Sequence, residues 1–439
     1  MLGGNNPDVF DCYEAWYPIA YERDLQKDKP QSFTLLGQPL VIWWDGQWRV
    51  FADRCPHRLA TLSEGRINEE GYLECPYHGW AFDGKGDCQR IPQQREGGDA
   101  HRSQRACAQV YAAVVQQGLL FVYAKPGVAA DPGTIPLVPA IAEAESAPQE
   151  WVCLDTFRDL PYDAFTLLEN VLDSSHLPFT HHRSVGNRAN TAPLELKILQ
   201  SGRNGFVGFW AEGPRKGKLG SQTTHFVAPN LMWHDLTSQQ LGRTLTVVYA
   251  TPIDKGKCRV FARFPFRLAA RIPRLILRWT PLWLSHLGQN AVLEDDQIFL
   301  HHQERYLEER GGSAHVSRAF YLPTKADLFV LEFHQWLQQY QVDPFPGKKL
   351  PPLLTKEQLL DRYHSHTQHC SSCGRALRYI DRLRNIAMGL GAMALLCLTQ
   401  DWEVASGILG LVAGAMGLGL GTLRRQFYQG RAIPPRNLT

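Results

Sequence analysis

Two short pairs of cysteine and histidine constrain this 439-residue chain more than any other feature. The first pair is Cys55-Pro56-His57, and the second, seventeen residues later, is Cys75-Pro76-Tyr77-His78. Two thiolates and two imidazoles can hold a tetrahedral zinc ion or a [2Fe–2S] cluster with cysteines on one iron and histidines on the other. Zinc fingers of the Cys₂His₂ kind place both histidines together on a helix. Here each turn supplies one cysteine and one histidine, which favours the cluster.

The sequence around these pairs predicts β-structure. Apolar runs at 40–44 and 48–51 flank Asp45-Gly46, a strong signal for a two-residue hairpin. A second hairpin is expected at 111–123, turning at Gln116-Gln117-Gly118. We therefore expect an all-β domain over residues 13–125 that holds the two metal-binding turns face to face, and a Pro- and Ala-rich linker over 126–150.

A second set of candidate ligands lies downstream. Asn170, Asp173 and His176 recur every three residues, which predicts that they share one helix face. Pro178 is expected to end or bend that helix, so that His181 approaches from another direction. Two histidines and a distant carboxylate fit the facial triad of non-haem Fe(II), which leaves positions open for O₂ and substrate. The neighbouring His182 is the alternative to His181 in this set.

The residues around the first pairs resemble the Rieske domain of ring-hydroxylating oxygenases. The matching segments are Cys55-Pro56-His57-Arg58, Leu62-Ser63-Glu64-Gly65, and Cys75-Pro76-Tyr77-His78-Gly79-Trp80 with Phe82. Rieske proteins of bc-type complexes usually carry Leu-Gly-Cys after the first histidine, whereas this chain has Arg58-Leu59-Ala60. The spacing of polar residues over 170–181 matches the same oxygenase family.

The resemblance implies roles for individual residues. Cys55 and Cys75 would hold one iron of the cluster, and His57 and His78 the other. His176 and His181 would bind the mononuclear Fe(II). The stretch Glu294-Asp295-Asp296, followed by Gln303, resembles the family's acidic-then-glutamine stretch. Counting back seven residues from Gln303 gives Asp296 as the third ligand, with Asp295 as the alternative.

Electron transfer is the second implication of the resemblance. Asp173 would hydrogen-bond to a Rieske histidine of a neighbouring subunit and carry the electron across, and Asn170 is grouped with it as a catalytic residue. A homotrimer and a ferredoxin-like donor with its reductase are the implied partners, because no flavin or nicotinamide site is visible in the sequence. The implied fold is α+β, with a helix-grip-type catalytic domain over residues 151–349.

A polar tail over residues 350–380 carries Cys370-Ser371-Ser372-Cys373. A C-x-x-C pair brings two thiols within reach of a disulfide, so Cys370 and Cys373 are redox-switch candidates with thioredoxin as a partner. Three nearby histidines, His364, His366 and His369, leave metal binding open as the alternative.

The C-terminal sequence predicts a membrane anchor. Residues 404–423 form a 20-residue run without a charged side chain, enough to cross a hydrocarbon core of about 30 Å. A shorter apolar run at 386–399 precedes it, and together they predict a transmembrane helical hairpin over 381–425. Arginines at both ends place the N-terminal body on the cytoplasmic or stromal side of a thylakoid or plasma membrane. The basic and aromatic stretch 263–287 would lie on the bilayer surface or, alternatively, form short core helices.

The Rieske–iron core, the C-x-x-C pair and the apolar tail together resemble the pheophorbide a oxygenase branch, with chlorophyllide a oxygenase and a translocon Rieske subunit as related members. The absence of a transit peptide suggests a cyanobacterial homologue. We therefore expect a membrane-anchored oxygenase of an apolar, chlorophyll-derived tetrapyrrole. The alternative is a membrane-bound Rieske electron carrier or redox sensor. A net charge of +3 and the lack of a nucleic-acid module argue against nucleic acid as a partner.

Overall fold

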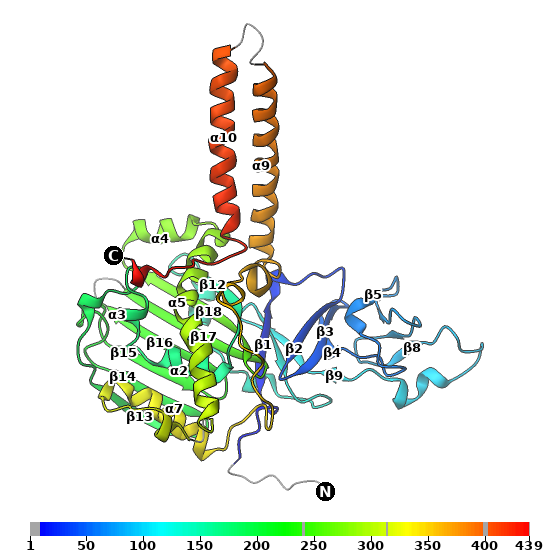
Figure 1. Cartoon of the computed structure of the whole chain (residues 1–439). Helices are drawn as coiled ribbons and strands as arrows, with labels where there is room; N and C mark the ends of the chain where they lie inside the picture. The colour runs from blue at the N-terminus through cyan, green and yellow to red at the C-terminus, as the bar shows by residue number, and fades with distance from the viewer. Residues whose placement is uncertain (1–8, 239–241, 313–314, 398–402, 439) are drawn as a thin grey trace.

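The computed structural model describes residues 9–238, 242–312, 315–397 and 403–438. Figure 1 shows three parts: an N-terminal β part, a large twisted sheet covered by helices, and two long helices that project from the top of the molecule. The predicted combination of an all-β domain with a mixed α+β domain is confirmed.

The N-terminal part contains three small antiparallel sheets. Their strands, in spatial order, are β1 (Trp16–Tyr21), β11 (Leu119–Tyr123) and β10 (Ala113–Gln116); β2 (Gln31–Leu35), β3 (Gln38–Trp44), β4 (Trp48–Ala52) and β9 (Val110–Tyr111); and β5 (Arg66–Ile67), β6 (Leu73–Glu74), β7 (Ala81–Phe82) and β8 (Cys88–Arg90). Both predicted hairpins are present, but the first turns through three residues, 45–47, rather than the predicted two, because Trp44 pairs with Trp48. In the second, Gln117 and Gly118 have positive φ angles of 49° and 73°, the backbone that a two-residue hairpin loop requires.

The segment between the two domains is packed rather than loose. It contains the helix α1 (Pro139–Ser146), whose residues Ala140 and Ile141 are buried. Gln117 of the first domain donates to the Val138 carbonyl over 3.0 Å, and Tyr249 of the second donates to the Pro136 carbonyl over 2.8 Å. The segment therefore joins the two domains through shared hydrogen bonds and a shared core.

The C-terminal part is built on a seven-stranded antiparallel sheet. Its spatial order is β12 (Val152–Leu160), β18 (Lys257–Leu268), β17 (Gly242–Asp254), β16 (Leu231–Ser238), β15 (Gln222–Val227), β14 (Gly205–Trp210) and β13 (Leu196–Gly202). Side chains alternate between its faces. Val248 packs with the helices, whereas Val247 and Tyr249 pack toward the N-terminal domain.

The helices that matter for the candidate sites cover one face of this sheet (Figure 1). They are α2 (Ala164–Leu172), α5 (Leu282–Glu309) and α7 (Leu328–Gln339). Shorter helices are α3 (Leu177–Thr180), α4 (Arg271–Trp279), α6 (Val316–Ala319), α8 (Lys356–Leu359) and the π-helix η9 (Tyr363–Thr367). Helix α5 begins at Leu282, directly after Pro281.

The prediction that Asn170, Asp173 and His176 share one helix face is wrong. Helix α2 ends at Leu172, and Asp173 has an extended backbone with ψ near 98°. The Asp173 carboxylate accepts the Ser175 N–H over 2.7 Å, a local bond that competes with continued helix. His176 then caps α3, and Pro178 lies in the first turn of that helix, where its missing N–H is tolerated.

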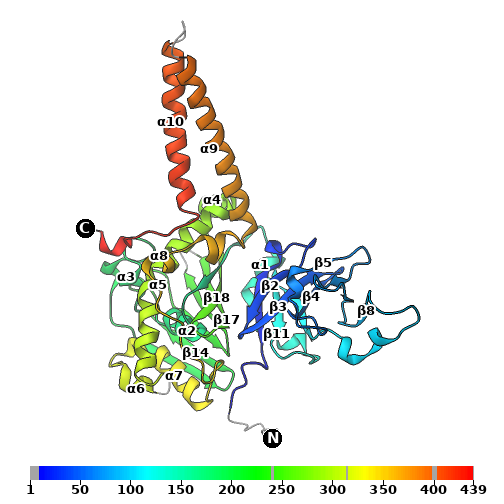
Figure 2. The same cartoon turned by 45° about the vertical axis from the view of Figure 1, so that its right-hand side comes forward.

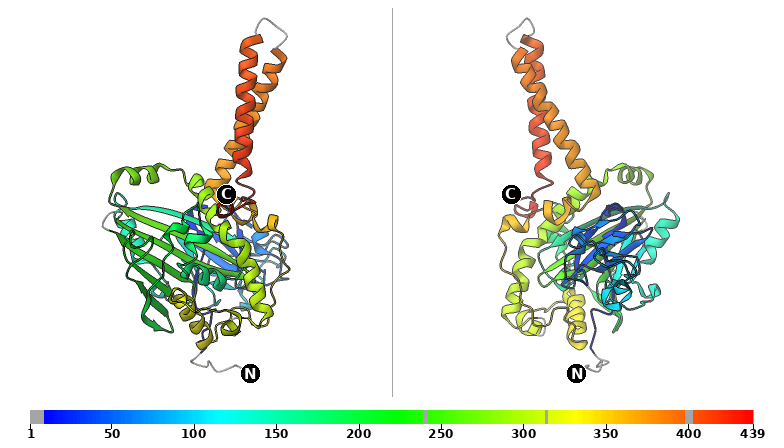
Figure 3. Two further views of the ribbon diagram at one scale, coloured as in Figure 1. Left: turned by 60° about the vertical axis from the view of Figure 1, so that its left-hand side comes forward. Right: turned by 90° about the vertical axis from the view of Figure 1, so that its right-hand side faces the viewer.

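The C-terminal helices α9 (Ser371–Cys397) and α10 (Glu403–Arg425) run side by side, as Figures 1 to 3 show from four directions. Among the described residues, one helix, Val404–Arg425, is long and apolar enough to cross a membrane. The predicted hairpin of two transmembrane helices is therefore corrected to one apolar helix. The reason lies in the first half of α9, which carries the charged residues Arg375, Arg378, Asp381, Arg382 and Arg384.

Candidate metal centres

The two Cys/His turns of the N-terminal domain adopt the same backbone loop. Cys55 N–H donates to the Ala60 carbonyl over 2.8 Å, and Cys75 N–H donates to the Trp80 carbonyl over 2.8 Å. In each loop the residue four places after the cysteine bonds back to that cysteine's carbonyl and has a positive φ, 59° at Leu59 and 71° at Gly79. Two equivalent loops therefore face each other, although one has a C-x-H and the other a C-x-x-H spacing.

The two loops place the cysteine side chains inside the domain and the histidine side chains nearer its surface. Cys55 and Cys75 are buried, whereas His57 is exposed and His78 half-buried. The two imidazole centroids are 4.6 Å apart, and His57 stacks on Trp80 at 4.5 Å. Burial raises the pKa of the Cys55 thiol to about 12, so a bound metal must displace its proton. Inner thiolates and outer imidazoles are the donor set of a Rieske [2Fe–2S] cluster, whose histidine-bound iron faces solvent.

The second set of ligands converges in the C-terminal domain. His176 Nε2 and His181 Nε2 are 3.3 Å apart, and Asp296 places carboxylate oxygens 3.8 Å from the first and 3.3 Å from the second. All three donor atoms lie within 4.8 Å of one another. Burial raises the pKa of Asp296, while the two histidines act in the opposite direction. This geometry fits the 2-His-1-carboxylate site for non-haem iron.

Three consecutive acids on α5 have three different surroundings. Glu294 lies between Arg158 and Arg362, with ion-pair distances of 2.7 and 2.6 Å. Asp295 Oδ2 is 3.4 Å from His181 Nδ1, on the side of the ring away from the site. Only Asp296 of these three faces both Nε2 atoms, whereas Asp295 contacts the outer nitrogen of the His181 ring.

The remaining predicted residues lie around this site in different ways. Asn170 Nδ2 donates to Asp296 Oδ1 over 3.3 Å. The Asp173 backbone carbonyl accepts from His176 Nδ1, which leaves Nε2 free to bind metal. His182, the alternative to His181, instead accepts the Arg188 N–H over 3.3 Å and is not part of the triad. Gln303 does not reach the triad and donates to Glu169 over 2.7 Å.

His234 is a buried residue near the site that sequence reasoning missed. It lies on β16, its Nε2 donates to the Val171 carbonyl over 2.9 Å, and its Nδ1 is 2.8 Å from the Thr224 hydroxyl. Burial lowers the pKa of His234 to about 4, so the ring is neutral. It fixes the end of α2 just before Asp173. Its place in a strand gave no sequence signal of this role.

The comparisons with known proteins agree with these two centres. Residues 15–114 match the Rieske [2Fe-2S] domain, and residues 226–314 match pheophorbide a oxygenase. Pheophorbide a oxygenase of Oryza sativa subsp. japonica is 36% identical over 96% of this chain and 84% of its own length. The chain belongs to the pheophorbide a oxygenase family of Rieske oxygenases. Its cofactors are therefore a [2Fe–2S] cluster and a mononuclear iron.

Other relatives of this Rieske oxygenase are named for different activities. Flavonoid 8-hydroxylase 2 of Ocimum basilicum is 34% identical over 91% of this chain and 79% of its own length. Among solved structures, dicamba monooxygenase matches with a TM-score of 0.59 at 20% identity, covering 75% of this chain and 97% of that one. NdmB of Pseudomonas putida matches with a TM-score of 0.58 at 21% identity, and the match covers 75% of this chain and 91% of NdmB. At such identities the structures establish the fold.

The tail cysteines of the Rieske oxygenase are free and buried. Cys370 and Cys373 lie at the beginning of α9 beside His366, whereas His364 and His369 are exposed. A fourth residue, His286 of α5, completes the group and was missed by sequence reasoning. Nothing in the stretch 263–287 marked this histidine as different from its neighbours.

Proposed function

We propose that this Rieske oxygenase inserts oxygen from O₂ into an apolar, chlorophyll-derived tetrapyrrole, using electrons supplied from outside the chain. The observation that carries the proposal is the convergence of His176, His181 and Asp296 in a chain 36% identical to a pheophorbide a oxygenase. Chlorophyllide a oxygenase of Arabidopsis thaliana is a further relative, 26% identical over 66% of this chain.

Residues around the proposed iron ligands hold those ligands in position. Bound iron supplies O₂ activation, which a facial triad allows because it leaves coordination positions open. Asn170 donates to Asp296 and holds one carboxylate oxygen. Asp295 and the Asp173 carbonyl hold the outer nitrogens of the two histidines. These contacts fix which nitrogen of each ring faces the iron.

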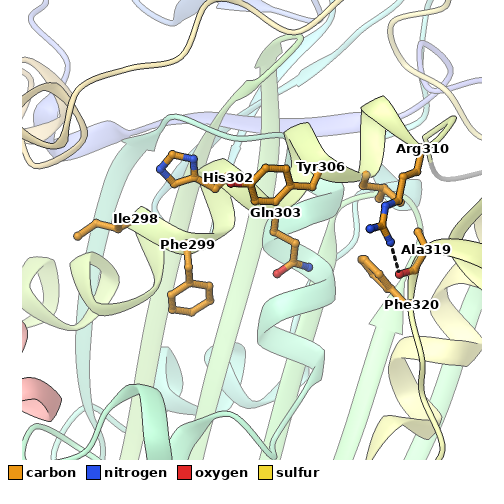
Figure 4. A pocket seen from close by; sticks show the side chains of 9 residues that line it. Ile298, Phe299, His302, Gln303, Tyr306, Arg310, Ala319 and Phe320 are labelled. Atoms are coloured by element: carbon orange, nitrogen blue, oxygen red, sulfur yellow. Dashed lines mark hydrogen bonds between the residues drawn. The ribbon is translucent and has the colours of Figure 1, made fainter.

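A pocket of about 570 Å³ is the proposed substrate site. It lies between α5 and α6, begins within about one helical turn of Asp296 and extends to Arg310, about four turns away, and Figure 4 shows its side chains. Phe299, Tyr306 and Phe320 give it aromatic walls suited to a flat macrocycle, and Arg310 offers a cation for a substrate carboxylate. Its volume is in the range of small-molecule sites.

Electrons are proposed to cross between subunits. In Figures 1 and 2 the tip of the N-terminal domain, at β5 and β8, and the iron site, beside α3, lie on opposite sides of the chain. A cluster with an exposed His57 can instead approach the iron of a second copy, as in a homotrimer. Asp173 is half-buried between α2 and α3 and would receive that histidine. A ferredoxin-like protein and its reductase would supply the electrons.

A membrane is the proposed location of the helical end. None of the α4 side chains is buried, and Trp279 is 81% exposed. Ile272 and Ile276 are exposed with it, and Arg271, Arg274 and Arg278, spaced i, i+3 and i+7, share a different side of the helix. Helix α4 lies at the same end of the molecule as α9 and α10 (Figure 1). A basic amphipathic helix beside an apolar one is typical of contact with an anionic bilayer, with the catalytic body on the cytoplasmic or stromal side.

The substrate is tested by single turnover. The reduced protein, with its iron content measured, is mixed with ¹⁸O₂ and either pheophorbide a, chlorophyllide a or a flavone. The masses of the products are then measured by mass spectrometry. We expect ¹⁸O in a tetrapyrrole product. Labelling of the flavone alone would contradict the tetrapyrrole proposal and favour a flavonoid substrate, after which the basil relative is named.

A further inference from the structure

We propose that His286, His366, Cys370 and Cys373 form a structural zinc site, separate from both iron centres. The four residues come from three segments: α5, the π-helix η9 and the start of α9. Their donor atoms lie within 4.8 Å of one another, and each side chain is at most 2% exposed.

The histidines are oriented as metal ligands. His286 Nε2 lies 2.7 Å from the Asp155 carbonyl, and His366 Nδ1 lies 2.6 Å from the Phe157 carbonyl. A carbonyl only accepts, so both rings donate outward, and each keeps a lone pair on its other nitrogen. Backbone carbonyls hold the outer nitrogen of metal-bound histidines in this way. Both carbonyls belong to β12, an edge strand of the large sheet, two residues apart and therefore on the same side.

The inward nitrogens are placed to share one cation. His286 Nδ1 and His366 Nε2 are 3.2 Å apart in a buried setting. With both protons directed at β12, two lone pairs face each other without a hydrogen to share. The two thiols lie against the same point, since Cys370 and Cys373 Sγ are each 3.4 Å from His286 Nδ1, and Cys373 Sγ is 3.4 Å from His366 Nε2.

The distances fit the edges of a tetrahedron around zinc. Zn–N bonds of about 2.0–2.1 Å and Zn–S bonds of about 2.3 Å give N···N edges of about 3.4 Å and N···S edges of about 3.6 Å. The observed separations are 3.2 Å and 3.4 Å. Two thiolates neutralise the charge of Zn²⁺, which suits a buried site, and the Cys373 N–H lies 3.5 Å from Cys370 Sγ, where it stabilises a thiolate. Four protein ligands leave no position for substrate, so the role is structural.

The site connects three parts of the chain. It joins the edge of the sheet to α5, the helix that carries Asp296 ten residues later, and to the first turn of α9. Ser371 adds a bond to the N-terminal domain, because its N–H and hydroxyl both donate to Asp24, over 2.8 and 2.7 Å. Zinc would therefore hold the root of the C-terminal helices against the iron-bearing helix.

The experiment is metal analysis of the full chain, purified without chelator and without an affinity tag that contains histidine. Zinc and iron are counted per chain by plasma mass spectrometry, with the Rieske absorption spectrum recorded on the same sample. We expect one zinc in the wild type. We expect loss of that zinc, with the Rieske spectrum retained, in His286→Ala and in Cys370→Ser/Cys373→Ser. His369→Ala, an exposed neighbour, is the matched control and keeps its zinc.

Cobalt provides a readout that needs neither activity nor a stable variant. The wild-type chain grown in Co²⁺ in place of Zn²⁺ should show the intense visible bands and thiolate charge-transfer band of a tetrahedral site with two sulfurs. Wild-type protein without bound zinc would overturn the proposal. So would a fourth iron per chain in place of zinc, or a Cys370–Cys373 disulfide in protein purified anaerobically, and the last result would favour the redox switch predicted from the sequence.

Discussion

The Rieske loops and the metal-binding groups around α5 are built in opposite ways. The four cluster residues lie between positions 55 and 78, in two loops whose hydrogen bonds are closed within six residues. The iron triad spans positions 176 to 296, and the proposed zinc site spans 286 to 373. Short loops carry their ligand geometry with them, whereas the other two groups exist only after α5 has docked on the sheet.

Helix α5 therefore contributes residues to both the iron triad and the proposed zinc site. It presents His286 to the tail, Glu294 to two arginines, and Asp296 to the histidines of the α2–α3 segment. A change on α5 should affect distant segments, while a change in a Rieske loop should stay local. The following predictions test this difference.

The largest effect is expected from separating the two iron centres on different chains. Cys55→Ser/Cys75→Ser removes the cluster and His176→Ala/Asp296→Ala removes the mononuclear site, so each variant alone should be inactive. If electrons cross between the subunits of a trimer, the isolated mixed trimer regains about a third of wild-type turnover, because only one of its three interfaces joins a chain with the iron to a neighbour with the cluster.

The measurement is product formation after the two variants are co-expressed with different tags and the mixed oligomer is isolated by both. Two variants purified separately and then mixed without subunit exchange serve as the control. A mixed oligomer as inactive as its parents would show that electron transfer takes place within one chain.

Asp173→Asn should be the next largest change. The carboxylate is lost from the proposed electron bridge, while the backbone carbonyl that orients His176 remains. We expect both metal contents unchanged and the rate of electron transfer from the reduced cluster slower by orders of magnitude, measured by stopped-flow absorbance. Ser175→Ala is the comparison, because it lies beside Asp173 without supplying the carboxylate. Wild-type rates in Asp173→Asn would remove its role.

Glu294→Gln tests whether the iron triad depends on the packing of α5, with thermal stability as the readout. Glu294 is 4% exposed and accepts from Arg158, over 2.7 Å, and from Arg362, over 2.6 and 2.7 Å. Removing its charge leaves two buried guanidinium groups without a counter-ion, which costs about 3–5 kcal/mol. Thermal unfolding should occur earlier, and iron should be lost from the triad before the Rieske spectrum changes. Simultaneous loss of both signals would contradict the proposed difference between the centres.

The same difference determines what could be predicted from the sequence. The Rieske ligands and the hairpins were predictable because their signals lie within a few residues. Asp296 was found only through the family resemblance, since its neighbours Asp295 and Glu294 are equally acidic and the sheet decides which one faces the histidines. The helix was extended too far past Leu172 because periodicity does not show that the Asp173 side chain bonds the Ser175 N–H. His286 could not be predicted, because its partners lie on β12 and in the tail.

The smallest effect is expected at Glu304, further along α5 and away from the metal ligands. Burial, and next the charge of Asp163, raise the pKa of Glu304 to about 8, while the Asp163 N–H donates to its carboxylate over 2.8 Å. The unfolded chain releases this proton near pH 4.3. The folded state therefore holds a proton that the unfolded state has lost, so this stabilising contribution is complete below about pH 4 and is lost as the pH rises through about 8.

Glu304→Gln keeps a neutral acceptor at all pH values. Its denaturation midpoint, measured from pH 5 to 8, should fall less than that of the wild type, whereas the exposed Glu309→Gln should follow the wild type. Parallel curves for all three proteins would show that Glu304 is ionised throughout.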